Sequence, residues 1–289
     1  MYFTFKNCLI PLQYYWVGVD QIPIFIKSAF ISWSHIEASY GLTENDIKEL
    51  EKVDLMLMRK ILKAHSKTPN EAIYLELGVL PLKYIIMSRK VMFLHYILTR
   101  DRSELLSRFF YAQLENPAKN DWTEEVKETL KELNITLTFS EIQSMKKDPF
   151  KKHVKMKVKE AAFKALINMK ESHSKMDNLT YKKLDMKSYL KCSSSFSKKA
   201  SSLFRYRTNM ADVKMNFKNK YSSLSLLCPM GCEKEDSQLH LLECEDLNDI
   251  SKHDEINYMD IFSENSSKSL EVAEILMQKE KIRKRILEI

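Results

Sequence analysis

The sequence predicts an all-α protein, with a large helical body and a small C-terminal module. Only 4 glycines and 7 prolines interrupt 289 residues, which is sparse for a β architecture because such folds need frequent turns. Leucine, lysine, glutamate, isoleucine and methionine are abundant, and most of these residues favour helix. Several segments also repeat apolar residues at helical spacing, so we expect less than about a tenth of the residues in strands.

The first helices of this body have recognisable boundaries. Thr43 can cap the first amides of a helix over residues 43–65, and Asp46 places an acid near its positive end. Residues 66–70 break the pattern. A short helix over residues 71–77 is then expected to end at Gly78, and another to run from Pro81 to about residue 98.

Three later segments complete the expected helices. Residues 123–133 and 150–169 both show helical periodicity, and the second of them carries an apolar stripe that we assign to the core. The last helix, over residues 270–287, ends in a run of Lys and Arg that suits the negative end of the helix dipole, so we assign it no function.

The charge of the chain is distributed unevenly. Residues 146–220 contain 19 Lys and 2 Arg against 6 Asp and Glu, a net charge of +15, so the remainder of a chain with net charge +7 carries −8. Such asymmetry is typical of proteins that bind polyanions. The alternative is a solvated, lysine-covered helical surface.

The strongest local signal is the segment CPMGCEKEDSQLHLLEC, which has the spacing Cys-x3-Cys-x7-His-x3-Cys and contains four candidate ligands: Cys228, Cys232, His240 and Cys244. Zn(II) prefers four tetrahedral nitrogen and sulfur ligands. Pro229 and Gly231 can turn the chain between the first two cysteines, and a helix would place the histidine and the last cysteine on one face. The segment therefore predicts a site for one zinc ion.

The expected zinc is structural, because four protein ligands leave no open position for an activated water. Asp236 or Ser237 is expected to cap the helix that carries the histidine, and Leu239 and Leu242 to pack it against the body. His253 is a reserve ligand. The alternative interpretation is two buried structural cysteines and a surface histidine on a short amphipathic helix.

No catalytic set accompanies the zinc motif. The sequence contains no adjacent pair of aspartates of the kind that holds two metal ions, no glycine-rich phosphate loop and no Gly-x-Ser-x-Gly motif. We therefore expect that the chain is not an enzyme on its own. An odd number of cysteines, five, argues against a disulfide framework and favours a reducing compartment, the nucleus or the cytoplasm. Charged residues and prolines interrupt the apolar N-terminus, so we expect no membrane span.

Several segments together resemble the C-terminal part of reverse transcriptases from non-LTR (LINE-like) retrotransposons. The similarity covers residues 36–289 and rests on IEASYGLTENDIKELEKVDLMLMRKIL, TPNEAIYLELGVLPLKYIIMSRKVMFLHYIL, HSKMDNLTYKKLDMKSYL, the cysteine motif and MDIFSEN. In that family the matching part follows the catalytic palm, whose aromatic-x-Asp-Asp motif this chain lacks. The resemblance implies thumb and linker helices that hold RNA and target DNA, and a zinc knuckle that assists them.

The resemblance and the residues together suggest a domain organisation. We expect an atypical apolar N-terminal segment (1–35), which does not resemble the end of a palm, and a helical thumb/linker-like domain (36–191). A basic, Ser- and Lys-rich connection (192–220), flexible over residues 192–202, then leads to the zinc knuckle (221–250). A C-terminal helical segment (251–289) completes the chain.

The leading functional hypothesis is a non-catalytic nucleic-acid-binding fragment with a structural Zn(II), whose partners are RNA, DNA or both, and a reverse transcriptase catalytic domain. The expected phosphate contacts are Lys147, Lys151, Lys152, Lys155, Lys159, Arg205 and Arg207. Phe204 and Tyr206 are candidate stacking partners, although a core role fits these aromatics equally well. The alternatives are a zinc-stapled helical protein-interaction module, a non-functional retrotransposon relic, and a polymerase whose palm comes from another chain.

Overall fold

The computed structural model describes residues 43–118, 121–191, 198–218, 226–251 and 257–287. The described chain is helical, and its β pairing is limited to a single antiparallel bridge between Leu227 and Glu235. The all-α prediction is therefore confirmed. The α-helices are α2 (Glu44–Leu62), α3 (Asn70–Leu77), α4 (Leu82–Leu98), α5 (Leu105–Glu115), α6 (Trp122–Glu132), α7 (Phe139–Ser144), α8 (Lys147–Lys170), α9 (Ser188–Lys191), α10 (Lys198–Arg207), α11 (Gln238–Glu243), α12 (Glu245–Ser251) and α13 (Ser266–Leu287). Short 3₁₀ turns are η3 (Ser174–Met176), η4 (Lys214–Phe217) and η5 (Tyr258–Phe262).

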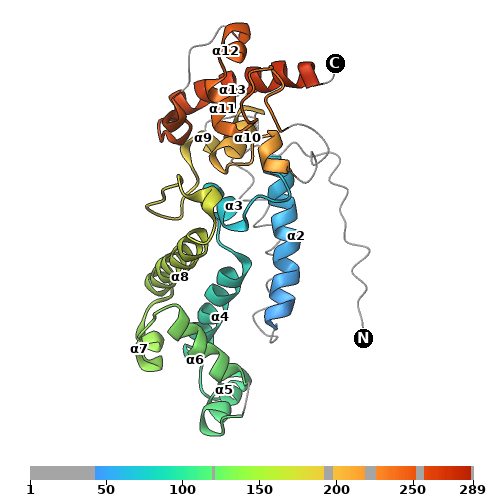
Figure 1. Ribbon diagram of the computed structural model, residues 1–289. Helices are drawn as coiled ribbons and strands as arrows, with labels where there is room; N and C mark the ends of the chain where they lie inside the picture. The colour runs from blue at the N-terminus through green and yellow to red at the C-terminus, as the bar shows by residue number, and fades with distance from the viewer. Residues whose placement is uncertain (1–42, 119–120, 192–197, 219–225, 252–256, 288–289) are drawn as a thin grey trace, which may run out of the picture.

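The helices form an elongated molecule (Figure 1). Helices α5, α6 and α7 lie at one end, and α11, α12 and α13 lie at the other. Helices α4 and α8 pack against each other along the first half, and α8 also contacts α3 in the middle of the molecule. The buried face of α8 is the apolar stripe expected from the sequence, and it includes Val154, Val158 and Leu166.

The three helices predicted between residues 43 and 98 are confirmed, although the first ends at Leu62, three residues before its predicted end. Thr43 caps α2 in a reciprocal capping box, in which its hydroxyl accepts from the amide of Asp46 and the Asp46 carboxylate accepts from the amide of Thr43. Gly78 ends α3 with a left-handed backbone at φ 63°. A Cβ at this position would lie 2.1 Å from the backbone nitrogen of Met186, so both conformation and space require glycine.

The prediction that residues 192–202 are flexible is wrong over the part that the structure describes, residues 198–202. Residues 198–207 form α10, and Ala200, Leu203 and Phe204 on this helix are buried. The composition does not indicate this helix, because Ser and Lys outnumber the apolar residues. The three buried residues nevertheless have the i, i+3, i+4 spacing of a helix face. Helix α10 packs against α13, so the C-terminal segment belongs to the same body.

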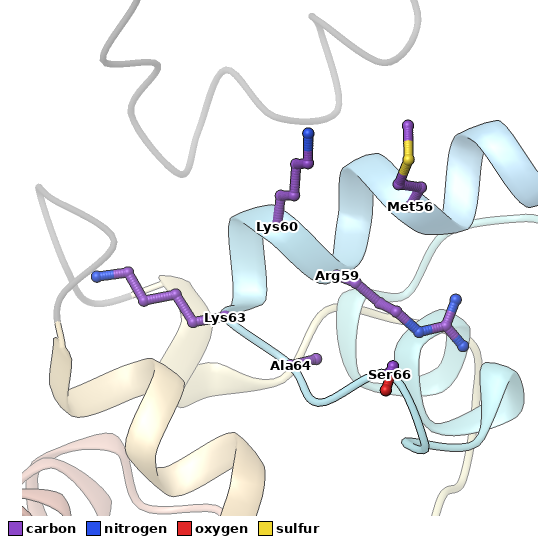
Figure 2. Close-up of a pocket in the computed structure, with 6 residues that line it drawn as sticks. All are labelled: Met56, Arg59, Lys60, Lys63, Ala64 and Ser66. Atoms are coloured by element: carbon purple, nitrogen blue, oxygen red, sulfur yellow. The ribbon is translucent and has the colours of Figure 1, made fainter.

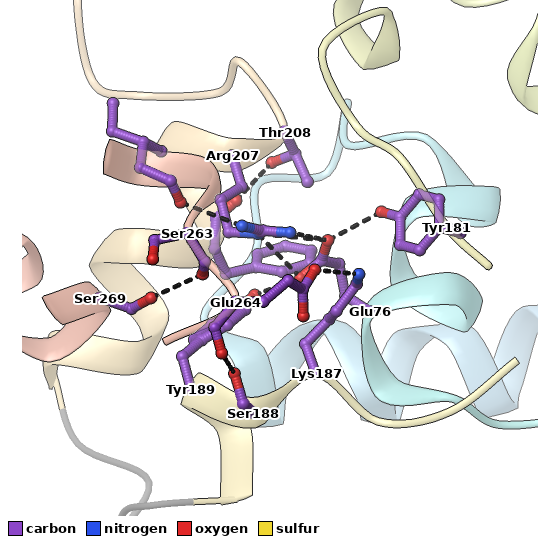
Figure 3. Close-up of polar contacts among 12 residues, drawn as sticks. Glu76, Tyr181, Lys187, Ser188, Tyr189, Arg207, Thr208, Ser263, Glu264 and Ser269 are labelled. Atoms are coloured by element: carbon purple, nitrogen blue, oxygen red, sulfur yellow. Dashed lines mark hydrogen bonds and ion pairs between the residues drawn. The ribbon is translucent and has the colours of Figure 1, made fainter. Parts of the chain in front are cut away.

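A buried ion pair connects α3 to α10 (Figure 3). The Arg207 guanidinium donates to the Glu76 carboxylate from Nε at 3.1 Å and from Nη2 at 3.2 Å. The hydroxyls of Tyr181 and Tyr189 donate to the same carboxylate at 2.8 and 2.7 Å. Burial raises the pKa of both tyrosines well above their usual value, which keeps these hydroxyls protonated as donors. The network therefore joins segments far apart in the chain around one satisfied buried charge.

Asp54 is a buried carboxyl on α2 whose Oδ1 has no hydrogen-bond partner among the described residues. Burial, with a smaller contribution from the Glu51 carboxylate, raises the pKa of Asp54 from 3.8 to about 7. The folded protein therefore binds this proton more tightly than the unfolded chain does. Because of this shift, ionisation of Asp54 lowers the free energy of unfolding as the pH rises from about 4 to about 7. Above that range the destabilisation is complete and no longer changes with pH.

Replacing Asp54 with Asn is expected to stabilise the protein by about 1–3 kcal/mol near pH 8 and to change little near pH 4, because only the ionised carboxyl is penalised. Urea unfolding at the two pH values measures the difference. The matched control is Asp177→Asn at an exposed position, which should show no such dependence. An equal effect of Asp54→Asn at both pH values would contradict the account.

Candidate metal centre

The first two candidate ligands, Cys228 and Cys232, lie in a small hairpin. The amide of Cys228 donates to the carbonyl of Lys234 at 2.8 Å, and the amide of Asp236 donates to the carbonyl of Leu226 at 2.9 Å. These two bonds on either side of the β bridge align the strand-like arms of the hairpin. The hairpin therefore fixes the backbone on both sides of the pair of cysteines.

The turn between the two cysteines depends on Gly231. Its backbone adopts φ 90°, which disfavours other residues, and its amide donates to the carbonyl of Cys228 at 3.2 Å. The amide of Met230 points at the Cys228 sulfur at 3.5 Å. An N–H group directed at the sulfur stabilises the thiolate form, as outer-shell donors do in metal sites. The turn expected from Pro229 and Gly231 is thus present.

The other two candidate ligands are His240, which lies on α11, and Cys244, which directly follows this helix. Ser237 caps this helix, with its Oγ accepting from the amide of His240 at 3.1 Å. Leu242 is buried as expected, whereas Leu239 is 48% exposed. The prediction for Leu239 is wrong because the inward face of this short helix carries Leu241 beside Leu242 instead.

The four side chains converge on one point. The sulfur of Cys232 lies 3.0 Å from Nε2 of His240 and 3.7 Å from the sulfur of Cys244. All four candidate ligand atoms, including the sulfur of Cys228, lie within 4.8 Å of one another. Zinc–sulfur bonds of about 2.3 Å in a tetrahedron give sulfur–sulfur separations of about 3.8 Å. The group can therefore hold one metal ion, and its composition of three thiols and one imidazole suits zinc.

Burial shifts the pKa of three of the four candidate ligands. Burial raises the pKa of Cys228 to about 12 and also raises the pKa of Cys244. Burial likewise lowers the pKa of His240, which favours the neutral imidazole that a metal requires. The thiols of Cys228 and Cys244 are therefore protonated near neutral pH until a metal ion displaces their protons, so metal affinity should rise with pH.

Helix α13 contacts both segments that carry the candidate ligands, the hairpin and α11. The Arg283 guanidinium forms a buried ion pair with Asp236 at the end of the hairpin. The ammonium group of Lys279, also buried, donates to the carbonyl of Leu242 on α11 at 2.9 Å. Asp236 also accepts from the amide of Lys214 at 2.8 Å. These contacts hold the hairpin and α11, which carry the candidate ligands, in position against α13 and the segment at Lys214.

Sequence reasoning missed this role of α13, because a basic C-terminal turn is an ordinary feature of helices. A signal was nevertheless present. Lys279 and Arg283 are four residues apart and continue the face that begins with the buried Val272 and Leu276, so both cations fall on the side of the helix that faces the core. The spacing does not indicate which groups these cations contact. Lys279 donates to a carbonyl on α11, and Arg283 pairs with Asp236 on the hairpin.

The predicted phosphate contacts divide into two groups. Lys147, Lys151, Lys152 and Lys155 on α8 are exposed and form no ion pair with any described residue. Lys159 on the same helix is instead partly buried and pairs with Asp185 at 3.0 Å. The structure therefore leaves the first four lysines available at the surface.

The remaining predicted contacts, in the segment FRYR, are corrected by the structure. Phe204 and Tyr206 are fully buried and Arg207 is 3% exposed, so none of the three is accessible to a nucleic acid. Arg205 is partly buried and pairs with Glu280 on α13 at 2.9 Å. The interleaved pattern reflects a helix with two core aromatics and two cations, one paired with the buried Glu76 and the other with the partly buried Glu280.

The lysines of α8 and the candidate metal centre lie in different parts of the molecule. The N-terminal end of α8 is next to α7 at one end, and α11 is at the other end (Figure 1). Proximity in the sequence therefore does not bring the basic surface to the cysteine cluster. His253, the reserve ligand, and the N-terminal segment 1–35 lie outside the described residues.

The chain was compared with models of protein families, with curated proteins and with solved structures, and none of the three comparisons found a match. Among the helices of the described residues, none combines the length and the apolar character that crossing a membrane requires.

Proposed function

We propose that the chain is a non-catalytic nucleic-acid-binding protein whose C-terminal part is stabilised by a structural zinc ion. The observation that carries the proposal is the exposed face of α8, where four lysines have no acidic partner among the described residues. Lys147, Lys151 and Lys155 follow one another at four-residue spacing, so their Cα atoms are about 6 Å apart along the helix axis. Lys152 extends the charge to the side. Such a row can contact successive phosphates.

The zinc has an indirect role in this proposal. The cysteine cluster is remote from α8 (Figure 1), so the metal stabilises α11 and α13 and makes no contact with a ligand bound at the α8 lysines. Four protein ligands complete the coordination of zinc, which fits a structural ion. The resemblance to the region after the palm of non-LTR reverse transcriptases is consistent with a role in binding RNA or DNA, and we extend that resemblance to this chain as part of the proposal.

The test is a salt titration of binding to a single-stranded RNA and to a DNA duplex, measured by fluorescence anisotropy. The variant replaces Lys147, Lys151 and Lys155 with Gln. On RNA, its slope of log K against log salt concentration should become shallower by about 2, because each lost phosphate contact reduces the slope by about 0.7. Affinity at low salt should fall more than about tenfold.

The matched control makes the same change of charge elsewhere. Lys48, Lys131 and Lys281 are exposed and lie on α2, α6 and α13, so their replacement by Gln removes three positive charges away from α8. This control should keep the salt slope of the unmodified chain. Equal losses in both triple variants would show that only net charge matters and would refute the proposed surface, and so would a flat salt dependence.

A further inference from the structure

A second exposed face runs along α2 and combines apolar and cationic side chains. The face contains Val53, Met56 and Lys60, whose steps of three and four residues place them on one side of the helix. Lys63 directly follows the helix, and Glu49, one turn before Val53, pairs with Lys52. Val53 is 59% and Met56 is 51% exposed, whereas Leu55, Met58 and Leu62 on the inner side are buried. The outer side of α2 thus presents apolar surface next to positive charge.

This face leads into a pocket at the C-terminal end of α2 (Figure 2). The pocket has a volume of about 560 Å³ and is lined by Met56, Arg59, Lys60, Lys63, Ala64 and Ser66, with no acidic residue. Figure 2 shows Met56 and Lys60 projecting from the same side of the helix, with Arg59 turned toward α3. Arg59 is fixed there, since it donates to the carbonyl of Thr68 at 3.1 Å and to the side chain of Asn70.

The two lysines of this face have no acidic partner among the residues that the structure describes. Lys60 and Lys63 form no ion pair with a described residue. Cations in the last turn of a helix complement its dipole, but that role does not account for two apolar side chains that remain more than half exposed on the same line. Adjacent apolar and positive surface is complementary to a ligand that carries apolar groups and negative charge together.

We infer that the outer face of α2 binds an acidic amphipathic segment of a partner protein. Apolar side chains of the partner would cover Val53 and Met56 and enter the pocket beside Ala64, while its carboxylates would pair with Lys60 and Lys63. A nucleic acid fits this face less well, because phosphates would leave the aliphatic surface uncovered and the face offers no aromatic ring for base stacking. This surface is distinct from the lysines of α8, and the inference does not depend on nucleic-acid binding there.

The experiment uses the full zinc-loaded chain and labelled peptides of about 15 residues, or four helical turns. One peptide has Asp and Glu on one face and Leu and Phe on the other, and a second replaces the apolar residues with Ser. We expect the amphipathic peptide to bind saturably, with a Kd below about 1 mM. Binding should weaken about tenfold or more in the double variant Lys60→Glu, Lys63→Glu and also in Met56→Ser. All three positions are exposed, with Met56 and Lys60 on α2 and Lys63 directly after it, and circular dichroism will verify that the variants remain folded.

The matched control for charge is Lys151→Glu, Lys155→Glu on α8, which should leave peptide binding unchanged. Absence of saturable binding, or equal binding of the Ser-substituted peptide, would overturn the inference. An RNA oligonucleotide that displaces the peptide and loses affinity in Lys60→Glu, Lys63→Glu but not in Met56→Ser would assign this face to nucleic acid instead. Loss of RNA binding confined to the α8 variant would leave the α2 inference standing.

Discussion

Replacing Cys232 with Ser is expected to abolish stoichiometric zinc binding and to unfold the C-terminal end of the molecule locally. Cys232 lies close to both His240 and Cys244, so its removal opens the coordination sphere. Binding of a structural zinc contributes about 10–16 kcal/mol in small zinc-binding peptides, and this energy is coupled to folding. Removing zinc with a chelator should therefore have the same effect as the substitution.

The structure also predicts how far the effect extends. The ion pair of Arg283 with Asp236 and the bond from Lys279 to Leu242 attach α13 to the hairpin and α11. Hydrogen exchange should therefore accelerate in the hairpin, α11 and the C-terminal half of α13, while α4 and α8 keep their protection.

The control for the cysteine substitution is Cys192→Ser, the same chemical change outside the motif. This variant should bind one zinc ion and retain the exchange pattern of the unmodified chain. Stoichiometric zinc in Cys232→Ser would contradict the assignment of ligands. Exchange that accelerates equally in α4 and α8 would contradict the local extent of the effect.

Replacing Arg207 with Met is expected to destabilise the protein by about 3–5 kcal/mol, because it leaves the Glu76 charge buried without its counterion. Glu76 is fully buried, and its remaining contacts are the hydroxyls of Tyr181 and Tyr189. Burial by itself would lower the pKa of Arg207, but the Glu76 carboxylate outweighs this effect and raises it above its usual value. The guanidinium of Arg207 is therefore charged near neutral pH.

Urea unfolding near pH 7 measures this loss. The matched control is Arg100→Met, since Arg100 pairs with Glu104 at an exposed site and such pairs contribute about 0–1 kcal/mol. The double variant Glu76→Gln, Arg207→Met should recover part of the stability, because it removes the unpaired charge. A loss below about 1 kcal/mol for Arg207→Met would show that the buried network does not connect α3 and α10 as described.

The parts of the fold that the sequence predicts are those encoded locally. Thr43 with Asp46 identifies the start of α2, and Gly78 identifies the end of α3, because caps depend on neighbouring residues alone. The candidate metal ligands were also predicted, since two pairs with short internal spacing need only a turn and a helix to bring each pair together.

Other features depend on contacts between distant segments. Glu76 and Arg207 are 131 positions apart, and no local pattern indicates that they pair. The same limit explains FRYR, because alternating aromatic and basic residues are compatible both with base stacking and with a helix that faces a core. Phe204 and Tyr206 are buried because α10 packs against elements distant in the sequence, α13 above all.

The most direct test of the account is the metal content and coordination of the reduced, unchelated chain. Elemental analysis should find one zinc ion per chain, and X-ray absorption at the zinc edge should show three sulfur ligands at about 2.3 Å and one nitrogen ligand at about 2.0 Å. Less than about 0.2 zinc per chain would contradict a tight structural site. A coordination shell dominated by oxygen would contradict the assignment of Cys228, Cys232, His240 and Cys244 as its ligands.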